Sequence, residues 1–171
     1  GADVTLVLGP SNISPNRKNI NLIPVTSAKE MYDAVMAFFP KTDIAVLSAA
    51  VADFRPEMVA DQKIKKNPEN DTFTIKLVKT EDILKSVGKI KTENQTVVGF
   101  ALETENGLEN AKKKLHTKNI DLIVLNEMNE SGVGFKTKTN KISIITKNDE
   151  VPIKPVMLSV YRRKNLHSMM P

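Results

Sequence analysis

The sequence predicts an α/β protein with a doubly wound, mainly parallel, Rossmann-like sheet and antiparallel strands at an edge or in a flap. Short apolar runs alternate along the chain with segments whose apolar residues recur at helical spacing. Several runs are continuously apolar, as in strands buried on both faces of a parallel sheet. Two others alternate apolar and polar residues, which is typical of antiparallel strands. There is no internal repeat and no linker, so a single domain over residues 1–171 is expected.

Composition narrows the possible functions. With 171 residues the chain is long enough to bury a core, and the net charge of +5 suits anionic ligands such as nucleotides, phosphorylated metabolites or nucleic acid. Aromatic residues make up 5% of the chain and Trp is absent, which argues against a stacking surface for single-stranded nucleic acid. The absence of Cys excludes disulfides and thiolate chemistry. No run approaches the ~18 apolar residues of a membrane span and no signal peptide pattern is present, so a cytoplasmic protein is expected.

The first elements are two short strands and a helix. Residues 3–8 form an apolar run that a Gly-Pro turn closes, and residues 21–25 form the next. Ser27 and Glu30 have the spacing of a capping box, which begins a helix. The apolar face of that helix repeats at helical spacing through Ala28, Met31, Tyr32, Val35, Met36 and Phe39.

The most informative stretch begins with the apolar run 43–52, which predicts a strand buried on both faces. The small side chains at its end leave room for a ligand beside the backbone, at the carboxyl end of a strand where open α/β sheets bind ligands. Asp53 and Arg55 then place an anion and a cation at this edge, and Pro56 is expected to end regular structure. The small residues are Ser48, Ala49 and Ala50.

A basic segment follows, with Lys63, Lys65 and Lys66 around Ile64. Three ammonium groups beside a strand-end Asp suit the handling of phosphates. On spacing alone, a surface ion pair and a solvated lysine run explain these residues better. Residues 57–72 hold little apolar surface to offset backbone ordering of roughly 1–2 kcal/mol per residue, so they are predicted to form a flexible flap that orders only when ligands bind.

The remaining elements continue the alternation. A helix is expected to start at Thr80–Asp82, with carboxylates in its first turn and Ile83, Leu84, Val87 and Ile90 inward. Another is expected to open at Glu103–Glu105. The other predicted segments are an alternating strand 73–79, a doubly buried strand 96–102, a buried strand 121–126, a loop 130–140, an alternating strand 141–146, a turn into 151–153 and a basic terminal helix 157–169.

Several motifs occur together in one order. Residues 49–56 read AAVADFRP and 63–66 read KIKK, and residues 97–104 read VVGFALET. A lysine-rich helix and a strand ending in Asn follow over 111–126, and Gly134-Phe135 precedes the segment 140–145. This combination closely resembles the phosphopantothenoylcysteine synthetases, or phosphopantothenate–cysteine ligases, of coenzyme A biosynthesis. The resemblance covers nearly the whole chain.

The resemblance implies a two-step ligation. The carboxylate of 4′-phosphopantothenate attacks the α-phosphate of CTP with Mg²⁺, and the amine of cysteine then displaces CMP from the acyl-cytidylate. The use of CTP follows from similarity to the bacterial branch. A homodimer is also implied, as is the flavin-dependent decarboxylase that is often fused upstream. Neither nucleic acid nor a membrane is an expected partner.

The resemblance also implies roles for individual residues. Lys63 would be catalytic, because it lies at the position of the family's loop lysine, and Asp53 would orient the nucleotide directly or through a metal ion. Phe100 would pack on the base or ribose, although core packing explains it equally well. Lys112 and Lys113 are expected to be solvated. The nucleotide-binding set is Ser48, Ala49, Ala50, Asp53, Lys63, Asp82, Ile83, Phe100, Lys114 and Lys118.

Two differences from the family pattern are present. Thr80-Glu81 stands where the family commonly has Asn-Pro, and the family's first strand and helix, with a Gly-rich loop and an Asn, are expected to be missing from the chain. A non-catalytic nucleotide-binding or interaction domain on the same scaffold is therefore the alternative function. A basic nucleic-acid-binding module is a third, supported by charge alone.

Overall fold

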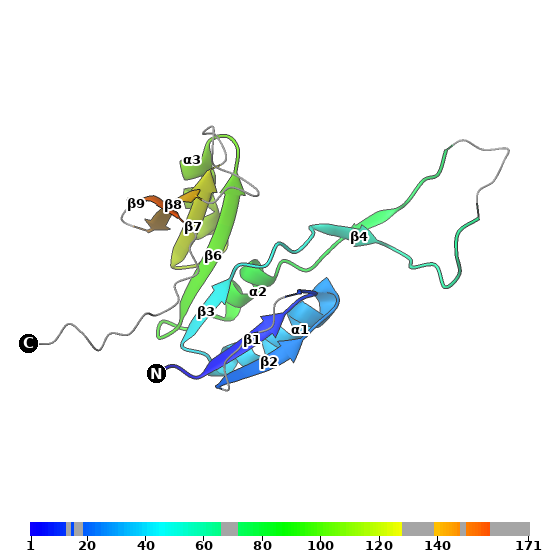
Figure 1. Ribbon diagram of the computed structural model, residues 1–171, viewed down its shortest axis with the longest axis horizontal. Helices are drawn as coiled ribbons and strands as arrows, with labels where there is room; N and C mark the ends of the chain where they lie inside the picture. The colour runs from blue at the N-terminus through cyan, green and yellow to red at the C-terminus, as the bar shows by residue number, and fades with distance from the viewer. Residues whose placement is uncertain (13–14, 16–18, 66–71, 128–138, 148–149, 158–171) are drawn as a thin grey trace, which may run out of the picture. The chain divides into compact units, whose positions relative to one another are not determined.

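The computed structural model describes residues 1–12, 15, 19–65, 72–127, 139–147 and 150–157. The chain divides into two compact units, residues 1–97 and 98–171, and each is described on its own. Figure 1 labels the elements of both units. The expectation of a single domain over the whole chain stays a prediction.

The first unit begins with a β-strand pair and a helix. Strands β1 and β2 are parallel, with Val4 opposite Ile20 and Leu8 opposite Pro24, and helix α1 packs against β1 and α2. Both strands agree with the sequence prediction to within one residue at each end. The elements of this unit are β1 (Val4–Leu8), β2 (Ile20–Pro24), α1 (Ala28–Phe38), the 3₁₀ helix η1 (Phe39–Lys41), β3 (Ile44–Leu47), β4 (Phe54–Pro56), β5 (Leu77–Lys79) and α2 (Ile83–Ile90).

Helix α1 starts with the predicted capping box. The Ser27 hydroxyl accepts the backbone N–H of Glu30 at 3.2 Å, and the Glu30 carboxylate accepts the backbone N–H groups of Thr26 and Ser27 at 2.6 and 3.3 Å. These bonds satisfy N–H groups that the first turn of a helix leaves without intrahelical partners. The helix therefore begins where the sequence places it.

Strand β3 is covered on one face only, and the prediction of a strand buried on both faces is wrong here. Ile44 and Val46 are 64% and 60% exposed, whereas Ala45 and Leu47 are half-buried. The continuous apolar run specifies side chains that tolerate burial, but burial on both faces needs a packed layer on each side. Thr96, at the start of the following strand, donates its backbone N–H to the Asp43 carbonyl at 2.8 Å.

The side chain of Gln95 connects distant segments of this unit by hydrogen bonds. Its side-chain NH₂ donates to the carbonyls of Phe39 and Thr42 at 2.9 and 2.8 Å, and its side-chain oxygen accepts the backbone N–H and hydroxyl of Thr92 at 3.0 and 3.2 Å. The residue is buried, and its bond to the Phe39 carbonyl is buried while the other three are partly buried. Gln95 thereby ties the end of η1 to the segment between α2 and Thr96.

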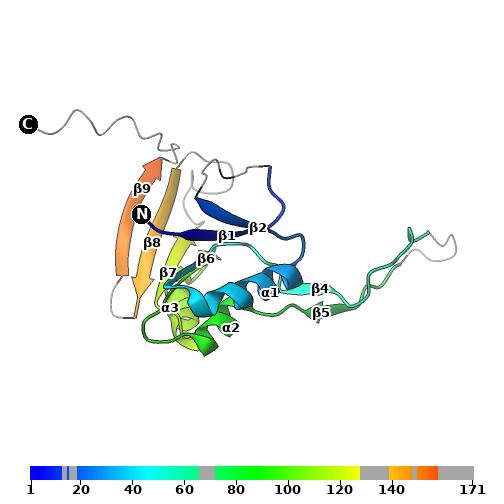
Figure 2. The same ribbon diagram turned by 90° about the horizontal axis from the view of Figure 1, so that it is seen from below.

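Strands β4 and β5 begin a long antiparallel arm, which comprises residues 54–65 and 72–79 of the described structure. Phe54 lies opposite Lys79 and Pro56 opposite Leu77, so Pro56 is inside a strand and does not end regular structure. Proline is compatible with this two-stranded pair because each strand keeps one edge without a partner. Residues 72–76 are not in a strand, so the predicted strand 73–79 is shorter than expected. Figure 2 shows the arm extending away from α1 and α2.

Helix α2 starts at Ile83, directly after the predicted start at Thr80–Asp82. Asp82 is the N-cap, and its carboxylate accepts the backbone N–H of Lys85 at 2.9 Å. The carboxylates predicted for the first turn therefore precede the helix, and the one at Asp82 caps it. Ile83 and Val87 are buried as predicted, but Ile90 is exposed.

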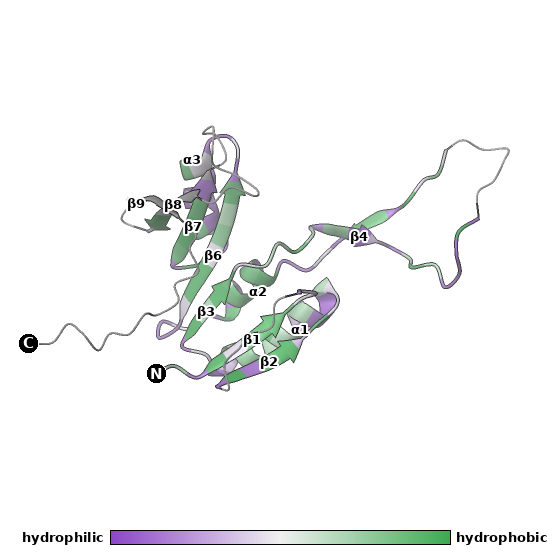
Figure 3. Ribbon diagram, viewed as in Figure 1, coloured by the Kyte–Doolittle hydropathy of each residue, from purple (hydrophilic) through white to green (hydrophobic). Residues whose placement is uncertain are grey.

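The second unit is a sheet with one helix among its described residues. Strand β6 pairs with β7 in parallel, while β7 with β8 and β8 with β9 are antiparallel. Figure 3 shows the apolar character of β6 and β7 beside the more polar α3. The elements are β6 (Thr96–Glu103), α3 (Gly107–Thr117), β7 (Leu122–Glu127), β8 (Thr139–Thr146) and β9 (Glu150–Met157).

Alternate residues of β6 face the core of this unit. Ala101 is buried, as are Ala111 and Leu115 of α3 and Ile123 of β7, and α3 contacts β7 and β8. Successive strand side chains point to opposite faces, and Phe100 and Leu102 on the other face are exposed. The prediction that 96–102 is doubly buried is therefore wrong, whereas β7 has no exposed residue from Leu122 to Asn126.

Helix α3 has a defined start and end. It starts at Gly107 after Asn106, whose φ of 51° is left-handed, so Glu103 belongs to β6 and not to the helix as predicted. At the other end Asn119 has φ 50°, its N–H bonds to the His116 carbonyl, and Ile120 N–H bonds to the Leu115 carbonyl, both at 3.2 Å. This is a Schellman motif with a buried apolar residue after it.

The described chain ends in strand β9, where the sequence predicts a turn and the start of a helix. It runs from Glu150 to Met157, so it is longer than the turn predicted at 151–153, and Met157 pairs with Thr139 instead of beginning a helix. The rest of the predicted terminal helix, 158–169, lies outside the described residues. Of the predicted loop 130–140, residues 130–138 also lie outside them, whereas Thr139 and Asn140 belong to β8, so the strand predicted at 141–146 begins two residues earlier. The parallel pairs β1–β2 and β6–β7, the helix α3 that connects the second pair, and the antiparallel strands at an edge and in the arm confirm the predicted α/β fold class.

Candidate functional site

In the first unit, the candidate site begins where β3 ends. Ser48, Ala49 and Ala50 are exposed, and Val51 N–H donates to the Ala49 carbonyl at 3.1 Å, so the backbone turns directly after the strand. The prediction of small side chains and accessible backbone at this edge agrees with the structure.

Thr80 connects the segment after β3 to the segment between β5 and α2 by hydrogen bonds. Its N–H donates to the Asp53 carbonyl at 2.9 Å, and its hydroxyl bonds to the Ala52 carbonyl. The structure thus brings Asp53 next to the segment that leads into α2. The Asp53 side chain is exposed, so its carboxylate is available to a ligand or a cation.

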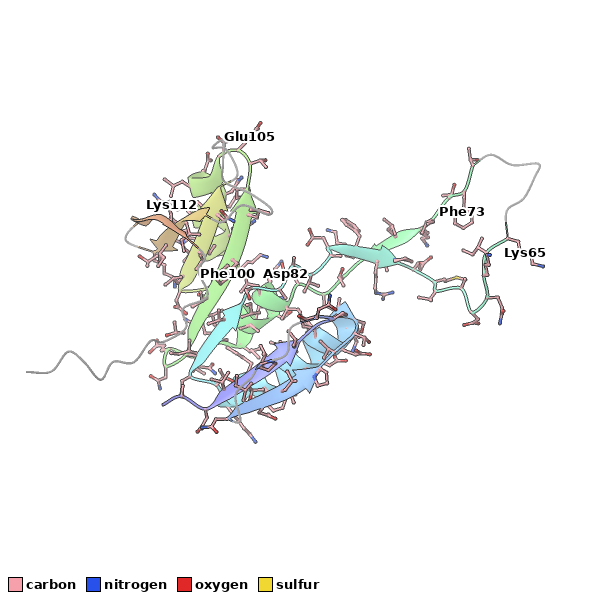
Figure 4. All side chains as sticks on the ribbon, in the orientation of Figure 1. Lys65, Phe73, Asp82, Phe100, Glu105 and Lys112 are labelled. Carbon is pink, nitrogen blue, oxygen red and sulfur yellow. The ribbon has the colours of Figure 1, made fainter. Side chains whose placement is uncertain are left out.

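Asp82 and Ile83 begin helix α2 two residues after Thr80. The Asp82 carboxylate caps the helix, and the Ile83 side chain is buried, so a ligand would meet Ile83 through its backbone. The amino terminus of a helix favours anions, because its N–H groups and dipole point toward them. Figure 4 labels Asp82 at this helix start. The structure therefore brings Asp53, Asp82 and Ile83 together.

Lys63 lies on the arm and not beside the strand end. It is exposed, as are its neighbours Ile64 and Lys65, and Lys66 lies outside the described residues. Lys65 and Phe73 are labelled on the two sides of the arm in Figure 4. The lysine side chain can therefore meet a ligand only if the arm and the ligand approach each other.

In the second unit, Phe100 lies on the face of β6 opposite to Ala101. It is 47% exposed, which excludes core packing in the described structure. Its neighbour across the parallel pair is Val124, and Leu102 lies next to it on the same face, opposite Asn126. The side-chain oxygen of Asn126 is buried and has no hydrogen-bond partner.

Lys114 points from α3 to the end of β6. Its ammonium nitrogen lies 2.5 Å from one carboxylate oxygen of Glu103, and the other oxygen accepts the side-chain NH₂ of Asn110 at 3.0 Å. Asn110 also donates to the Glu105 carbonyl at 3.2 Å. We call Glu103, Asn110 and Lys114 the carboxylate triad. It fixes both a carboxylate and an ammonium at the carboxyl end of β6.

Lys118 is the C-cap of α3, where a cation interacts favourably with the helix dipole. Its N–H donates to the Lys114 carbonyl at 3.0 Å. Lys112 and Lys113 are exposed, as expected for solvated lysines, and Figure 4 labels Lys112 on the outer side of the unit.

A preformed metal cage is absent from the described residues, in which no group of three His, Cys, Asp or Glu side chains could hold a metal ion. Magnesium usually keeps several waters and binds through one or two carboxylates plus substrate phosphates. The exposed carboxylate of Asp53 fits that second arrangement. None of the described helices is long and apolar enough to cross a membrane.

The sequence motifs do not predict the roles of two of these residues. The sequence predicts Thr80 only as part of a helix start, and Glu103 as the first residue of a helix. The signal for Glu103 was present in its position directly after an apolar strand, with Asn110 and Lys114 at i and i+4 of the next helix. Two helical residues four apart lie on one face, so both can reach a single strand-end carboxylate.

Comparison with known proteins supports the family resemblance that the sequence motifs indicate. Residues 1–158 match the family described as "DNA/pantothenate metabolism flavoprotein C-terminal domain". A cysteine/cysteine sulfinic acid decarboxylase from an unknown prokaryotic organism is 48% identical over 151 residues, which cover 88% of this chain and 42% of that protein. The coenzyme A biosynthesis bifunctional protein CoaBC of Vibrio vulnificus (strain YJ016) is 44% identical over 144 residues, which cover 84% and 36%.

A solved structure of the C-terminal domain of coenzyme A biosynthesis bifunctional protein CoaBC has a TM-score of 0.70 and 34% identity, and the match covers 92% of this chain and 69% of that one. The chain therefore spans about two fifths of the length of the curated relatives and about two thirds of this solved domain. The resemblance to phosphopantothenate–cysteine ligase domains is confirmed, and the chain belongs to the DNA/pantothenate metabolism flavoprotein C-terminal domain family.

Proposed function

We propose that this chain is a CTP-dependent ligase domain that joins 4′-phosphopantothenate to cysteine in coenzyme A biosynthesis. The observation that carries the proposal is the strand-end site in the first unit. There, Thr80 holds the exposed Asp53 segment next to the amino terminus of α2. Membership of the family and the similarity to CoaBC proteins support the same substrate class.

The proposed reaction has two steps. The pantothenate carboxylate attacks the α-phosphorus of CTP, and the bond to the β-phosphate breaks, so that pyrophosphate leaves and an acyl-cytidylate forms. The amine of cysteine then attacks the acyl carbon, CMP leaves and the amine loses a proton. Each step brings an anion or a nucleophile toward a negatively charged phosphate, so fixed cations and N–H donors are required.

The first unit offers these groups at the strand end. Ser48, Ala49 and Ala50 would present backbone groups to the nucleotide, and the N–H groups at Asp82 and Ile83 would meet its phosphates. The Asp53 carboxylate would hold Mg²⁺ together with the phosphates, and the bound cation would neutralise part of their charge. Lys63 would bring its ammonium to the reacting phosphoryl or acyl centre when the arm meets the ligand.

In the second unit, Phe100, Lys114 and Lys118 are the proposed nucleotide-binding residues. The exposed ring of Phe100 suits packing on a base or ribose. The two lysines lie at i and i+4 of α3, so they would meet phosphates from one helix face.

The proposal includes a homodimer and a partner activity. The arm exposes apolar side chains that suit pairing with a second copy: Phe54, Met58, Val59, Ile64, Phe73, Ile75 and Leu77. A flavin-dependent decarboxylase is the proposed companion activity, since one relative is named a decarboxylase and another is a bifunctional protein. The proposed location is the cytoplasm.

A turnover assay tests the function. Protein, CTP, Mg²⁺, 4′-phosphopantothenate and cysteine are combined, and phosphopantothenoylcysteine and CMP are measured by mass spectrometry. Because the chain spans about two fifths of the length of its curated relatives, a version extended with further sequence of the Vibrio vulnificus CoaBC is assayed beside the chain. ATP and cysteine-free reactions are the controls.

The outcomes separate the candidate functions. Product from CTP in either version supports the ligase. Binding of CTP by calorimetry with no product from the extended version would favour the non-catalytic nucleotide-binding domain. Binding of nucleic acid with no affinity for CTP would contradict both.

A further inference from the structure

The carboxylate triad differs from an ordinary surface ion pair. The Glu103 side chain is only 15% exposed, whereas both members of the Lys29–Asp33 pair on α1 are more than half exposed. Exposed pairs contribute little, because solvent screens them and two long side chains must be ordered. At Glu103, Asn110 occupies the second oxygen, so the carboxylate has a fixed orientation before Lys114 meets it.

The Lys114 ammonium has N–H donors left for a group other than Glu103. An ammonium has three N–H donors, and Glu103 takes one of them. The Lys114 side chain is 40% exposed, so its remaining donors face solvent at the carboxyl end of β6. Free lysine side chains have high rotamer entropy, which an anionic ligand would otherwise have to overcome.

We infer that Glu103 is a positioning residue, which holds the Lys114 ammonium at the end of β6 so that it can contact a polyphosphate. The inference rests on the proposed function, because it assigns to Lys114 the phosphate chain of a nucleotide. Asn110 assists by orienting the carboxylate. Glu103 itself does not contact the phosphate, since two anions repel each other.

A double-mutant cycle tests this inference. Mg²⁺-CTP and, separately, inorganic tripolyphosphate are titrated into the protein and into Glu103→Gln, Lys114→Ala and the double variant. Gln keeps the length of the side chain and its contact with Asn110 but removes the charge. Glu103→Gln is expected to weaken both ligands about three- to tenfold, and the double variant to bind no more weakly than Lys114→Ala. Asp33→Asn, which removes the charge of the exposed pair, is the matched control and leaves binding unchanged.

Three results would each overturn the inference. Glu103→Gln could bind the ligands as tightly as the unaltered protein or more tightly. The losses of affinity of the two single variants could add in the double variant, or Lys114→Ala could leave the affinity for tripolyphosphate unchanged. Binding is compared only where thermal unfolding shows each variant folded at the assay temperature, and Glu103→Asp is measured if Glu103→Gln unfolds. If the unaltered protein binds tripolyphosphate but not CTP, the proposed function fails, and the tripolyphosphate cycle still decides the role of Glu103.

Discussion

At the scale of single residues, Gln95 shows how a polar side chain can stabilise a fold from inside it. It is buried, and it satisfies two carbonyls at the end of η1 together with Thr92. Buried polar groups that lose their partners cost more than the bond itself contributes, because water cannot replace the partner.

Replacing Gln95 should therefore lower the free energy of unfolding. Gln95→Ala is expected to destabilise the protein by about 2–4 kcal/mol, since the Thr42 carbonyl and the Thr92 N–H lose the Gln95 side chain and the Phe39 carbonyl keeps only the Thr42 N–H. Urea unfolding followed by circular dichroism measures the change. The neighbouring exposed Asn94→Ala is the control, and a loss no larger than that of the control would show that water satisfies these groups.

Replacing Lys63 is expected to affect activity and not stability, because its side chain is exposed on the arm. Lys63→Gln should abolish or greatly slow amide formation in the turnover assay while the fold is retained. The circular dichroism spectrum and thermal midpoint check the fold. Full activity of the variant, or loss of the folded signal, would remove Lys63 from the catalytic role.

The sequence identified individual residues where a motif was present and missed them where only contacts define the role. Asp53 was found because it follows an apolar run and lies in a recognisable motif. Glu103 was missed because its role depends on Asn110 and Lys114, which meet it only after α3 packs on the sheet. Ile83 was found as part of a segment, but its burial shows that its side chain serves the core.

At the scale of elements, the start of α1 is a local structure that the sequence specifies well. Every contact of the capping box lies between Thr26 and Glu30, so no distant packing is needed to form it. Hydrogen bonds from Thr26 and then Ser27 lower the pKa of the Glu30 carboxyl below its usual value of 4.5.

A lowered pKa makes stability depend on pH in one direction. The Glu30 contribution is present above about pH 4.5 and is lost as the pH falls through the lower pKa of the folded state. Acidification from ~pH 6 to ~pH 3 should therefore lower the thermal midpoint less in Glu30→Gln than in the unaltered protein. Thermal scans by circular dichroism test this, and equal slopes would show that the capping box does not respond to protonation.

The strands were predicted less well than this helix start. An apolar run shows that a strand can be buried, but the number of covered faces is a property of the neighbouring layers. Ile44, Val46, Phe100 and Leu102 all belong to apolar runs and are all exposed. The same limit explains why β5 is shorter than its alternating sequence, since strand pairing in the arm stops at Leu77.

At the scale of the molecule, the proposed pairing of two copies depends on the exposed arm. Residues 72–77 of the arm alternate polar and apolar side chains, and Phe73 is 67% exposed. The Glu57–Lys76 ion pair of 2.8 Å helps to hold the two sides of the arm together near its base. The described arm therefore presents exposed apolar side chains.

If the arm joins two copies, a charge at Phe73 should separate them. Phe73→Lys is expected to convert a dimer into a monomer at micromolar concentration, because an unpaired ammonium cannot be buried in an apolar interface. Sedimentation velocity measures the state. Thr74→Lys adds the same charge at a neighbouring exposed position and should keep more of the dimer. A protein that is monomeric without any substitution would contradict the arm as the interface.

The proposed dimer also has a consequence for the biogenesis of the protein. If two copies pair through the arm, a newly translated copy would present its apolar arm to the cell until a second copy arrives, and encounter of two copies is slow when the chain is scarce. During that interval the arm resembles the surfaces that chaperones and proteases recognise. The level of synthesis would then set how much of the protein survives, so that a poorly expressed gene yields disproportionately little of it.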